Sequence, residues 1–293
     1  DTNKAIIVND GGVAFSSNLN SANVSDTFIE GKNNFITTQF YTVAQSPPSF
    51  SLDYIIGGTQ DNGNYQFNSP NTNLSNANSV QSGDGAATFF NQAGNRYAIV
   101  NYIYNDIITR LDYNISGVYT GNTILAGASG YGGILTIDSN EGSFINPAAL
   151  DSNQNVYFSN ATTGTGSATS YSIRRILNVD GNSPTSSLLT GLLSSEPTAL
   201  EVSPFTTGSS VLIVGTKDGN IVKISDADTT PVANPLTNPG TAGSISDIQF
   251  GATENDLYIT YYNYGTSIVN VYYSSDGGVS WANKEGTGAS KLP

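Results

Sequence analysis

The chain has 293 residues and is acidic, with 23 Asp and Glu against 10 Lys and Arg, although charged residues make up only 11% of it. The net charge of -13 argues against nucleic acid or an anionic membrane surface as a partner. The absence of cysteine, histidine and methionine excludes disulfides, thiolate and imidazole metal ligands, and Ser-His-Asp catalysis. No cofactor is expected, and any metal would be a hard cation such as calcium, held by oxygen atoms.

The uncharged part of the composition is polar rather than apolar. Asn, Ser, Thr and Gly are abundant, and there are 17 tyrosines, which is typical of extracellular proteins. The chain begins at Asp1, so we expect a mature or excised segment of a longer protein that is secreted or held at the outer cell surface. No apolar run approaches the roughly 18 residues of a membrane-spanning helix, so no span is predicted.

Short β-branched and aromatic runs alternate with turns rich in Gly, Asn and Asp along the whole chain, which predicts an all-β fold. They indicate six hairpins, which start roughly 50 residues apart. The hairpins are Ala5–Ser16, Tyr54–Phe67, Tyr97–Leu111, Asn155–Ile176, Val211–Ser225 and Leu257–Ser274. Three further segments are predicted inner strands that precede a hairpin, namely Gln39–Gln45, Pro197–Ser203 and Ser244–Phe250.

This regular period favours a single β-propeller domain over residues 1–293, with about six or seven four-stranded blades. A β-sandwich is the alternative, but it would not give so regular a repeat. The first hairpin has no inner strand before it, and the chain ends at Pro293, where another inner strand would begin. We therefore expect the closing blade to be incomplete in this chain, and to be completed by the remainder of the polypeptide or by another chain.

Four short motifs carry a family resemblance. Ser274–Trp281 reads S-x-D-x-G-x-S-W and resembles the Asp-box, a tight turn in which glycines permit positive φ. Gly57–Gly63 (GGTQDNG), Asn9–Val13 (NDGGV) and Ser82–Gly85 (SGDG) are similar to signature phrases of sortilin-type propellers. The chain thus resembles the Asp-box (BNR-repeat) β-propellers, which include sialidases, xyloglucan hydrolases and surface proteins that Bacteroidetes-type bacteria export by type IX secretion.

The resemblance implies an extracellular propeller, but it does not imply one activity. It implies that the Asp-box residues form a structural corner at the rim of the propeller, away from any site: Ser274, Asp276, Gly278 and Trp281. A sialidase needs three converging arginines, and among the four arginines of this chain Arg174 and Arg175 are neighbours that should point to opposite faces of a strand. Sialidase activity is therefore not expected.

A glycoside hydrolase resembling the xyloglucan-specific endo-glucanases is the catalytic alternative. It needs two carboxylates that flank a cleft. Asp10 lies in a loose match to the phrase that holds one such acid in that family, and Asp61 or Asp84 could supply the second. The simpler interpretation is that Asp10, Asp61 and Asp218 cap hairpin turns by hydrogen bonds to the backbone.

We therefore expect a non-catalytic interaction or structural module that binds polysaccharide or protein at the cell surface. Tyrosine-rich strands could stack against sugars, although about half of these tyrosines should be core because strand side chains alternate. The tyrosines in question are Tyr97, Tyr102, Tyr104, Tyr258, Tyr261, Tyr262, Tyr264, Tyr272 and Tyr273. The densest acidic loops offer Asp138, Glu141 and Asp151 as weak calcium candidates, with a turn role as the alternative.

Overall fold

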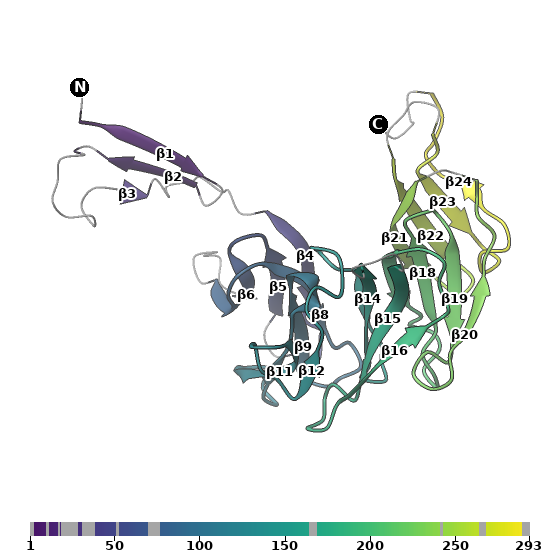
Figure 1. Ribbon diagram of the computed structural model, residues 1–293, viewed down its shortest axis with the longest axis horizontal. Coiled ribbons are helices and arrows are strands. Elements are labelled where there is room, and N and C mark those ends of the chain that lie inside the picture. Colours follow the sequence, from purple (N-terminus) through teal and green to yellow (C-terminus); the bar gives the residue numbers. More distant parts are fainter. Residues whose placement is uncertain are drawn as a thin grey trace.

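The computed structural model describes residues 3–9, 12–16, 18, 29–30, 39–50, 53–69, 77–163, 169–240, 243–263 and 268–288. Within these residues the regular structure consists of 24 strands and one 3-10 turn, Ile103–Asn105. The fold is therefore all-β. The strands form five blade sheets of a β-propeller and one further, N-terminal sheet (Figure 1).

The sheets follow one another in chain order, and their strands have the following bounds. The N-terminal sheet holds β1 (Ala5–Asn9), β2 (Gly12–Ser16) and β3 (Ile29–Glu30). Blade 1 holds β4 (Phe40–Gln45), β5 (Asp53–Thr59), β6 (Gly63–Ser69) and β7 (Asn78–Gln81). Blade 2 holds β8 (Gly85–Phe90), β9 (Tyr97–Tyr102), β10 (Ile107–Tyr113), β11 (Tyr119–Ala128) and β12 (Leu135–Ile137). Blade 3 holds β13 (Ala148–Leu150), β14 (Val156–Thr163), β15 (Thr169–Leu177) and β16 (Thr185–Thr190). Blade 4 holds β17 (Pro197–Val202), β18 (Leu212–Thr216), β19 (Ile221–Ser225) and β20 (Val232–Pro235). Blade 5 holds β21 (Ser244–Phe250), β22 (Leu257–Tyr262), β23 (Val271–Ser274) and β24 (Ala282–Asn283).

All six predicted hairpins are confirmed as antiparallel strand pairs. They are β1–β2, β5–β6, β9–β10, β14–β15, β18–β19 and β22–β23. The three predicted inner strands correspond to β4, β17 and β21, each paired with the first strand of its hairpin. Four blades have the predicted four strands, whereas β12 adds a fifth strand to blade 2 by pairing parallel to β11.

The blades pack face to face, and a hydrophobic core fills each of the four contacts between consecutive blades. Neighbouring residues of one strand enter different cores, because strand side chains alternate. In β18, for example, Leu212 and Val214 face blade 3 while Ile213 faces blade 5. Tyr157 of β14 likewise faces blade 4, whereas Val156 and Phe158 face blade 2. Two-sided burial explains why these strands are continuous apolar runs rather than alternating ones.

Hydrogen bonds from side-chain hydroxyl groups cross three of these four blade contacts. Thr42 Oγ1 donates a hydrogen bond to the carbonyl of Ala86 in blade 2, at 2.6 Å. Thr198 Oγ1 donates to the carbonyl of Ile245 in blade 5, at 2.7 Å. Between blades 3 and 4, the hydroxyl of Ser159 donates to the carbonyl of Pro197 at 2.8 Å. Each bond joins a strand near the centre of the propeller to the innermost strand of the next blade.

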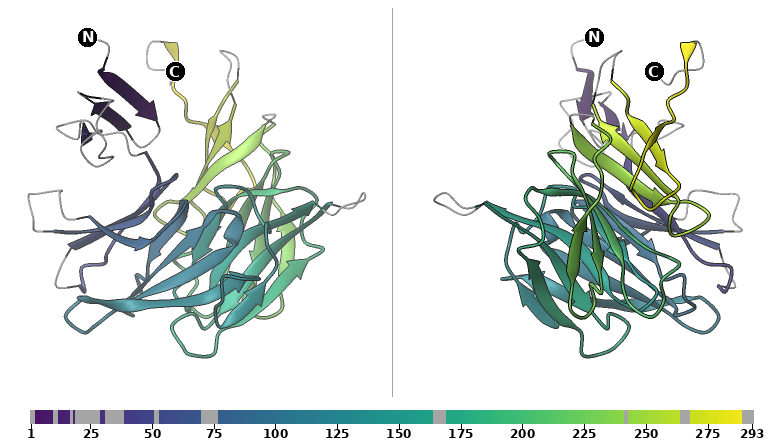
Figure 2. Two further views of the ribbon diagram at one scale, coloured as in Figure 1. Left: turned by 60° about the vertical axis from the view of Figure 1, so that its left-hand side comes forward. Right: turned by 90° about the vertical axis from the view of Figure 1, so that its right-hand side faces the viewer.

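The N-terminal sheet stands apart from the five blades in both Figure 1 and Figure 2. Its strand order is β1-β2-β3, so β1 forms an edge, and among the described residues no strand pairs with the other side of β1. Among the side chains that the structure describes, none of this sheet belongs to one of the four interface cores. The described residues thus form five blades rather than the predicted six or seven, because the first predicted hairpin is not packed into the ring.

Candidate functional site

A cavity of about 790 Å³ lies where the innermost strands of the five blades come together. Its walls are residues of β4, β8, β13, β17 and β21, together with the loop that leads into β13. This position is the central channel of the propeller. Small-molecule sites in proteins have similar volumes, about 300–1,000 Å³.

Polar and apolar side chains both line the channel, and among the described residues its two formal charges are both negative. Glu201 of β17 and Asp247 of β21 contribute these carboxylates, and none of the residues that line the channel is Lys or Arg. Amide and hydroxyl side chains supply most of the remaining polar surface: Gln45, Gln92, Gln249, Asn146, Thr42, Thr88, Thr198, Ser246 and Tyr41. The channel is therefore suited to a hydroxyl-rich or cationic ligand rather than an anionic one.

Glu201 is the most perturbed acid of the channel. Its neighbours Leu200 and Val202 enter the core between blades 3 and 4, so the alternation of β17 turns Glu201 toward the channel. Burial raises the pKa of Glu201 to about 7, and the nearby negative charge of Asp247 adds to the rise. Glu201 is thus close to half protonated at neutral pH. Its protonated form can donate a hydrogen bond, and its ionised form can only accept hydrogen bonds.

A row of exposed tyrosines continues from the channel across the outer face of blade 5. The register places Gln249 opposite Tyr258, and Tyr258 opposite Tyr273, so that these three side chains share one face. The Tyr258 and Tyr273 rings lie 4.8 Å apart and are tilted by 36°. Tyr262, on the same strand as Tyr258, is 67% exposed. We call Gln249, Tyr258, Tyr262 and Tyr273 the tyrosine face.

The rest of blade 5 holds the tyrosine face in place. Tyr273 donates a hydrogen bond to Asp256 at 2.5 Å, and the ammonium group of Lys284 lies 5.2 Å from the centre of the same ring. Tyr261 and Tyr272 point the other way and are buried in the core against blade 4. The prediction that about half of the tyrosines are core is confirmed for this blade; Tyr264 lies outside the described residues.

Two of the acids predicted as catalytic alternatives, Asp61 and Asp84, are not among the residues that line the channel. Asp84 Oδ1 accepts a hydrogen bond from the backbone N–H of Asp61 at 2.8 Å, so these two residues meet at the tip of the β5–β6 hairpin. Asp61 itself has a positive φ of 60°, as a tight turn requires. Asp218 occupies the matching turn of blade 4, where Thr216 donates to its carboxylate at 2.6 Å. Asp10 lies outside the described residues.

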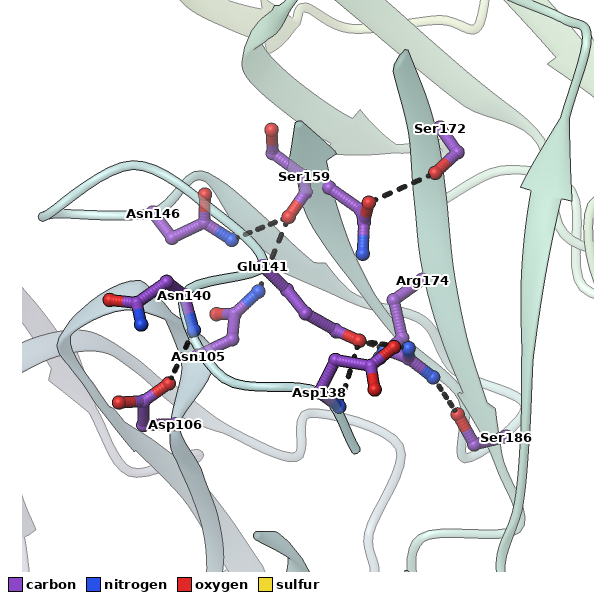
Figure 3. A network of polar contacts seen from close by, with 11 residues as sticks. Asn105, Asp106, Asp138, Asn140, Glu141, Asn146, Ser159, Ser172, Arg174 and Ser186 are labelled. Atoms are coloured by element: carbon purple, nitrogen blue, oxygen red, sulfur yellow. Dashed lines mark hydrogen bonds and ion pairs between the residues drawn. The ribbon is translucent and has the colours of Figure 1, made fainter. Parts of the chain in front are cut away.

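Two of the three calcium candidates are joined by a hydrogen bond from the backbone N–H of Asp138 to Glu141 Oε1, at 3.2 Å, whereas Asp151 has other partners. Glu141 is fully buried and forms a two-pronged ion pair with Arg174 of β15, as Figure 3 shows. Asp151 accepts hydrogen bonds from the backbone of Asn153 and Asn155 at 2.8 and 2.7 Å. Within the described part of the chain, no three acidic side chains gather where they could hold a metal ion. The contacts of Asp151 are those of the turn role, whereas Glu141 is the buried partner of Arg174.

Arg174 and Arg175 point to opposite sides of β15, as the sequence predicts. Arg174 faces Glu141 and also donates to Ser186 at 2.7 Å (Figure 3). Arg175 instead donates to the carbonyls of Ala227 and Thr229 at 2.8 and 3.1 Å. Both guanidinium groups are therefore engaged in structural contacts on different faces of the strand.

The Asp-box segment, Ser274–Trp281, forms a closed turn at the end of β23. Asp276 Oδ1 accepts hydrogen bonds from Ser274 and from the backbone N–H groups of Val279 and Ser280, at 2.8, 3.1 and 2.9 Å. Gly277 and Gly278 have positive φ of 72° and 87°, which the turn requires. The indole of Trp281 donates to the carbonyl of Thr237 at 2.7 Å and so ties the turn to the segment that follows blade 4.

Replacing Asp276 by Asn should destabilise the protein in a pH-dependent way. Hydrogen bonds from the Ser280 side chain and backbone, and then from Ser274, lower the pKa of Asp276 to about 2. Because an unfolded Asp titrates near 3.9, the stabilisation is present above about pH 4 and is lost as pH falls toward 2. Thermal unfolding of wild type and Asp276→Asn from pH 7 to 2.5 should therefore give two Tm values that differ at pH 7 and converge in acid.

The exposed Asp53 supplies the matched control for this prediction, since Asp53→Asn also removes one carboxylate. Its Tm should follow that of wild type at every pH. An Asp276→Asn variant whose Tm equals that of wild type at pH 7, or whose deficit is as large at pH 2.5, would show that this carboxylate does not hold the turn.

The fold and the channel together define a β-propeller whose central channel carries two acidic side chains among the described residues. No protein-family model and no curated protein matches the chain. Among solved structures it is similar to a chain of one titled "Crystal Structure of Mitotic Checkpoint Complex", with a TM-score of 0.55 and 11% identity. The match covers 96% of this chain and 75% of that chain. At this identity the likeness shows the fold alone.

The described residues contain no helix that is long and apolar enough to cross a membrane.

The functional candidates Glu201 and Asp247 were not found from the sequence. Glu201 lies in the predicted inner strand Pro197–Ser203, and Asp247 lies in the predicted inner strand Ser244–Phe250. An acid within a predicted inner strand is the available signal, because inner strands of a propeller line its channel. The GGTQDNG and Asp-box motifs instead indicate residues in tight turns.

Proposed function

We propose that this protein is a non-catalytic interaction module that binds a polysaccharide through the mouth of the central channel and the tyrosine face. The observation that carries the proposal is the continuity of the two surfaces. Gln249 lines the channel and also begins the row that Tyr258 and Tyr273 continue across blade 5. A protein ligand, the other partner class expected for such a module, is an outcome of the test below.

The chemistry of this surface matches a sugar chain. The faces of tyrosine rings offer flat apolar area for the C–H groups of a pyranose, while their hydroxyls and nearby amides form hydrogen bonds. The tyrosine face supplies rings that are exposed yet fixed by neighbours, which limits the entropy lost on binding. The uncharged amides and hydroxyls of the channel favour a neutral, hydroxyl-rich ligand over an anionic one.

Three finer expectations accompany this proposal. We expect the protein to belong to the Asp-box, sortilin-type family and to be secreted or held at the outer cell surface. We also expect six or seven blades in the complete propeller. The N-terminal sheet would then be an incomplete blade, whose innermost strand comes from the remainder of the polypeptide or from another chain. The edge position of β1, which has no second partner strand among the described residues, supports this expectation.

Glycoside hydrolysis is the second candidate function, and the pKa of Glu201 is the observation that favours it. A carboxyl group that titrates at about 7 can protonate a leaving glycosidic oxygen at neutral pH. Asp247 on the neighbouring strand would remove a proton from the attacking water. The hydrolase would thus use Glu201 as acid and Asp247 as base, in place of Asp10, Asp61 and Asp84.

A glycan array, run beside a hydrolysis assay on soluble β-glucans, tests both candidates. The module predicts glycan binding without new reducing ends, and binding that Glu201→Gln retains at least in part. The hydrolase predicts reducing ends that Glu201→Gln and Asp247→Asn each abolish. Absence of glycan binding together with capture of a purified protein partner would instead place this chain among protein-binding propellers and would overturn the proposal.

A further inference from the structure

The outer face of blade 1 carries four apolar side chains, next to the polar Gln45 that lies opposite Ile55, and no blade covers it among the described residues. Val43 of β4 and Ile55 of β5 are 65% and 47% exposed, and Phe40 is 38% exposed. The register places Ile55 directly opposite Phe67, and the Phe40 ring packs edge-on against Phe67 with 6.0 Å between centroids. An exposed apolar patch of this kind marks a surface that another element covers. We call Phe40, Val43, Ile55 and Phe67 the blade 1 patch.

The other uncovered face of the propeller has a different character. On blade 5, the strand positions that face outward carry Asp247, Gln249, Tyr258 and Thr260, all of which are polar or amphipathic. The four blade contacts within the structure are instead filled by aliphatic and aromatic side chains. The blade 1 patch therefore resembles a blade contact in its chemistry, whereas the tyrosine face does not.

The N-terminal sheet carries a matching apolar face. Ile6 and Phe15 are 67% and 39% exposed, and they are direct partners in the β1–β2 ladder. Direct partners project from the same side of a sheet, so these two side chains form one small apolar surface. Neither Ile6 nor Phe15 belongs to an interface core, so among the described residues no blade covers this surface.

Chain order selects the N-terminal sheet as the occupant of the blade 1 patch. Blades 2 to 5 each pack against the sheet that immediately precedes them in the chain, and the N-terminal sheet immediately precedes blade 1. About nine residues separate Glu30 from Phe40, which can span roughly 30 Å. Packed sheets are separated by about 10 Å, so the connection is long enough for a face-to-face contact.

We propose that the N-terminal sheet docks on blade 1 as an additional blade, with the Ile6 and Phe15 surface against Val43 and Ile55 of the blade 1 patch. The docked sheet buries the apolar faces of both partners in one step. Val43 also lines the central channel, so the docked sheet lies at the edge of the proposed sugar site. The contact is tested without any glycan, so failure of the docking and failure of the polysaccharide proposal can be told apart.

Disulfide trapping tests this contact directly, because the natural chain has no cysteine. The variants Phe15→Cys/Val43→Cys and Phe15→Cys/Ile55→Cys place one thiol on each surface, at exposed positions. Phe15→Cys/Tyr258→Cys samples the other open face, and Phe15→Cys/Ile115→Cys uses a residue that is 85% exposed in the β10–β11 connection. All four are oxidised at low protein concentration, and the products are separated by non-reducing electrophoresis and mass spectrometry.

The expected result is an intramolecular disulfide in at least one blade 1 pair, formed at least tenfold faster than in either control pair. Equal rates in all four variants would mean that the sheet moves freely on its connection, and would overturn the proposal. Disulfides only between two copies would overturn it too, by making a second chain the occupant. The proposal would also be overturned if neither blade 1 variant formed an intramolecular disulfide.

Hydrogen exchange gives a second measurement that does not depend on thiol geometry. Val43→Asp places a charge in the blade 1 patch at an exposed position, so blade 1 itself should stay folded. Docking predicts faster exchange of the β1–β2 amides in Val43→Asp than in wild type, with exchange in blades 2 to 5 unchanged. Identical β1–β2 exchange in the two proteins would contradict docking.

Discussion

Replacing Glu201 by Gln should stabilise the protein at pH 8 and leave its stability unchanged at pH 4. The pKa of Glu201 is raised to about 7, chiefly by burial, whereas an unfolded Glu titrates near 4.3. The contribution of Glu201 is therefore fully present below about pH 4 and is lost as pH rises toward 7. Gln imitates the protonated form, so the variant avoids a loss of up to about 3 kcal/mol at pH 8.

Urea unfolding at pH 4, 6 and 8 measures this effect, with Asp53→Asn as the control for loss of an exposed carboxylate. The gain of Glu201→Gln over wild type should grow with pH, while the control shows none. Asp247→Asn should also stabilise the protein near pH 7, because it removes a neighbouring negative charge. A Glu201→Gln variant that is no more stable than wild type at pH 8 would show that the channel solvates this carboxylate. Groups held at a cost to stability are typical of functional sites.

Replacing Arg174 by Met should lower the free energy of unfolding by about 3–5 kcal/mol, because it leaves the buried charge of Glu141 without its partner. Glu141 is fully buried, and Arg174 is 7% exposed. The backbone N–H of Asp138, 3.2 Å from Glu141 Oε1, is too weak a replacement for a bidentate guanidinium. Chemical denaturation of the purified variant at pH 7 gives the loss.

The double variant Glu141→Leu/Arg174→Met removes both charges, and it should recover most of the stability that Arg174→Met loses. Arg175→Met is the matched control, because Arg175 bonds backbone carbonyls and a serine near the surface instead of a buried acid. It should lose much less. Equal losses in Arg174→Met and Arg175→Met would contradict the assignment of Glu141 and Arg174 as a buried ion pair.

The repeat in the sequence predicted the fold because it reports on burial. Hairpins such as Val211–Ser225 combine apolar strands that are buried on both faces with turns rich in Gly and Asp. The sequence pattern does not predict the inner strands of blades 2 and 3, and the reasons are local. Strand β8 (GAATFF) is rich in small residues that suit the crowded channel, and β13 has only three residues. Neither gives a periodic apolar signal.

The candidate site was harder to predict than the fold. Glu201 and Asp247 lie 46 positions apart in the sequence, and only the packing of β17 against β21 brings their strands together. Motifs show where the chain must turn tightly, so they led to Asp61, Asp84 and Asp276, whose described contacts are those of turns. The place of the N-terminal sheet relative to the other blades could not be predicted either, since it depends on contacts between sheets rather than within them.

A binding titration with β-glucan oligosaccharides tests the central claim most directly, which is that the tyrosine face continues the channel as one sugar-binding surface. Wild type, Tyr258→Ala and Tyr131→Ala are compared; Tyr131 is equally exposed, at 45% against 43%, but follows β11 in blade 2. The account predicts that Tyr258→Ala weakens binding by about tenfold, as loss of an aromatic contact of about 1.4 kcal/mol would, while Tyr131→Ala binds as wild type does. Unchanged affinity in Tyr258→Ala, or equal losses in both variants, would contradict it.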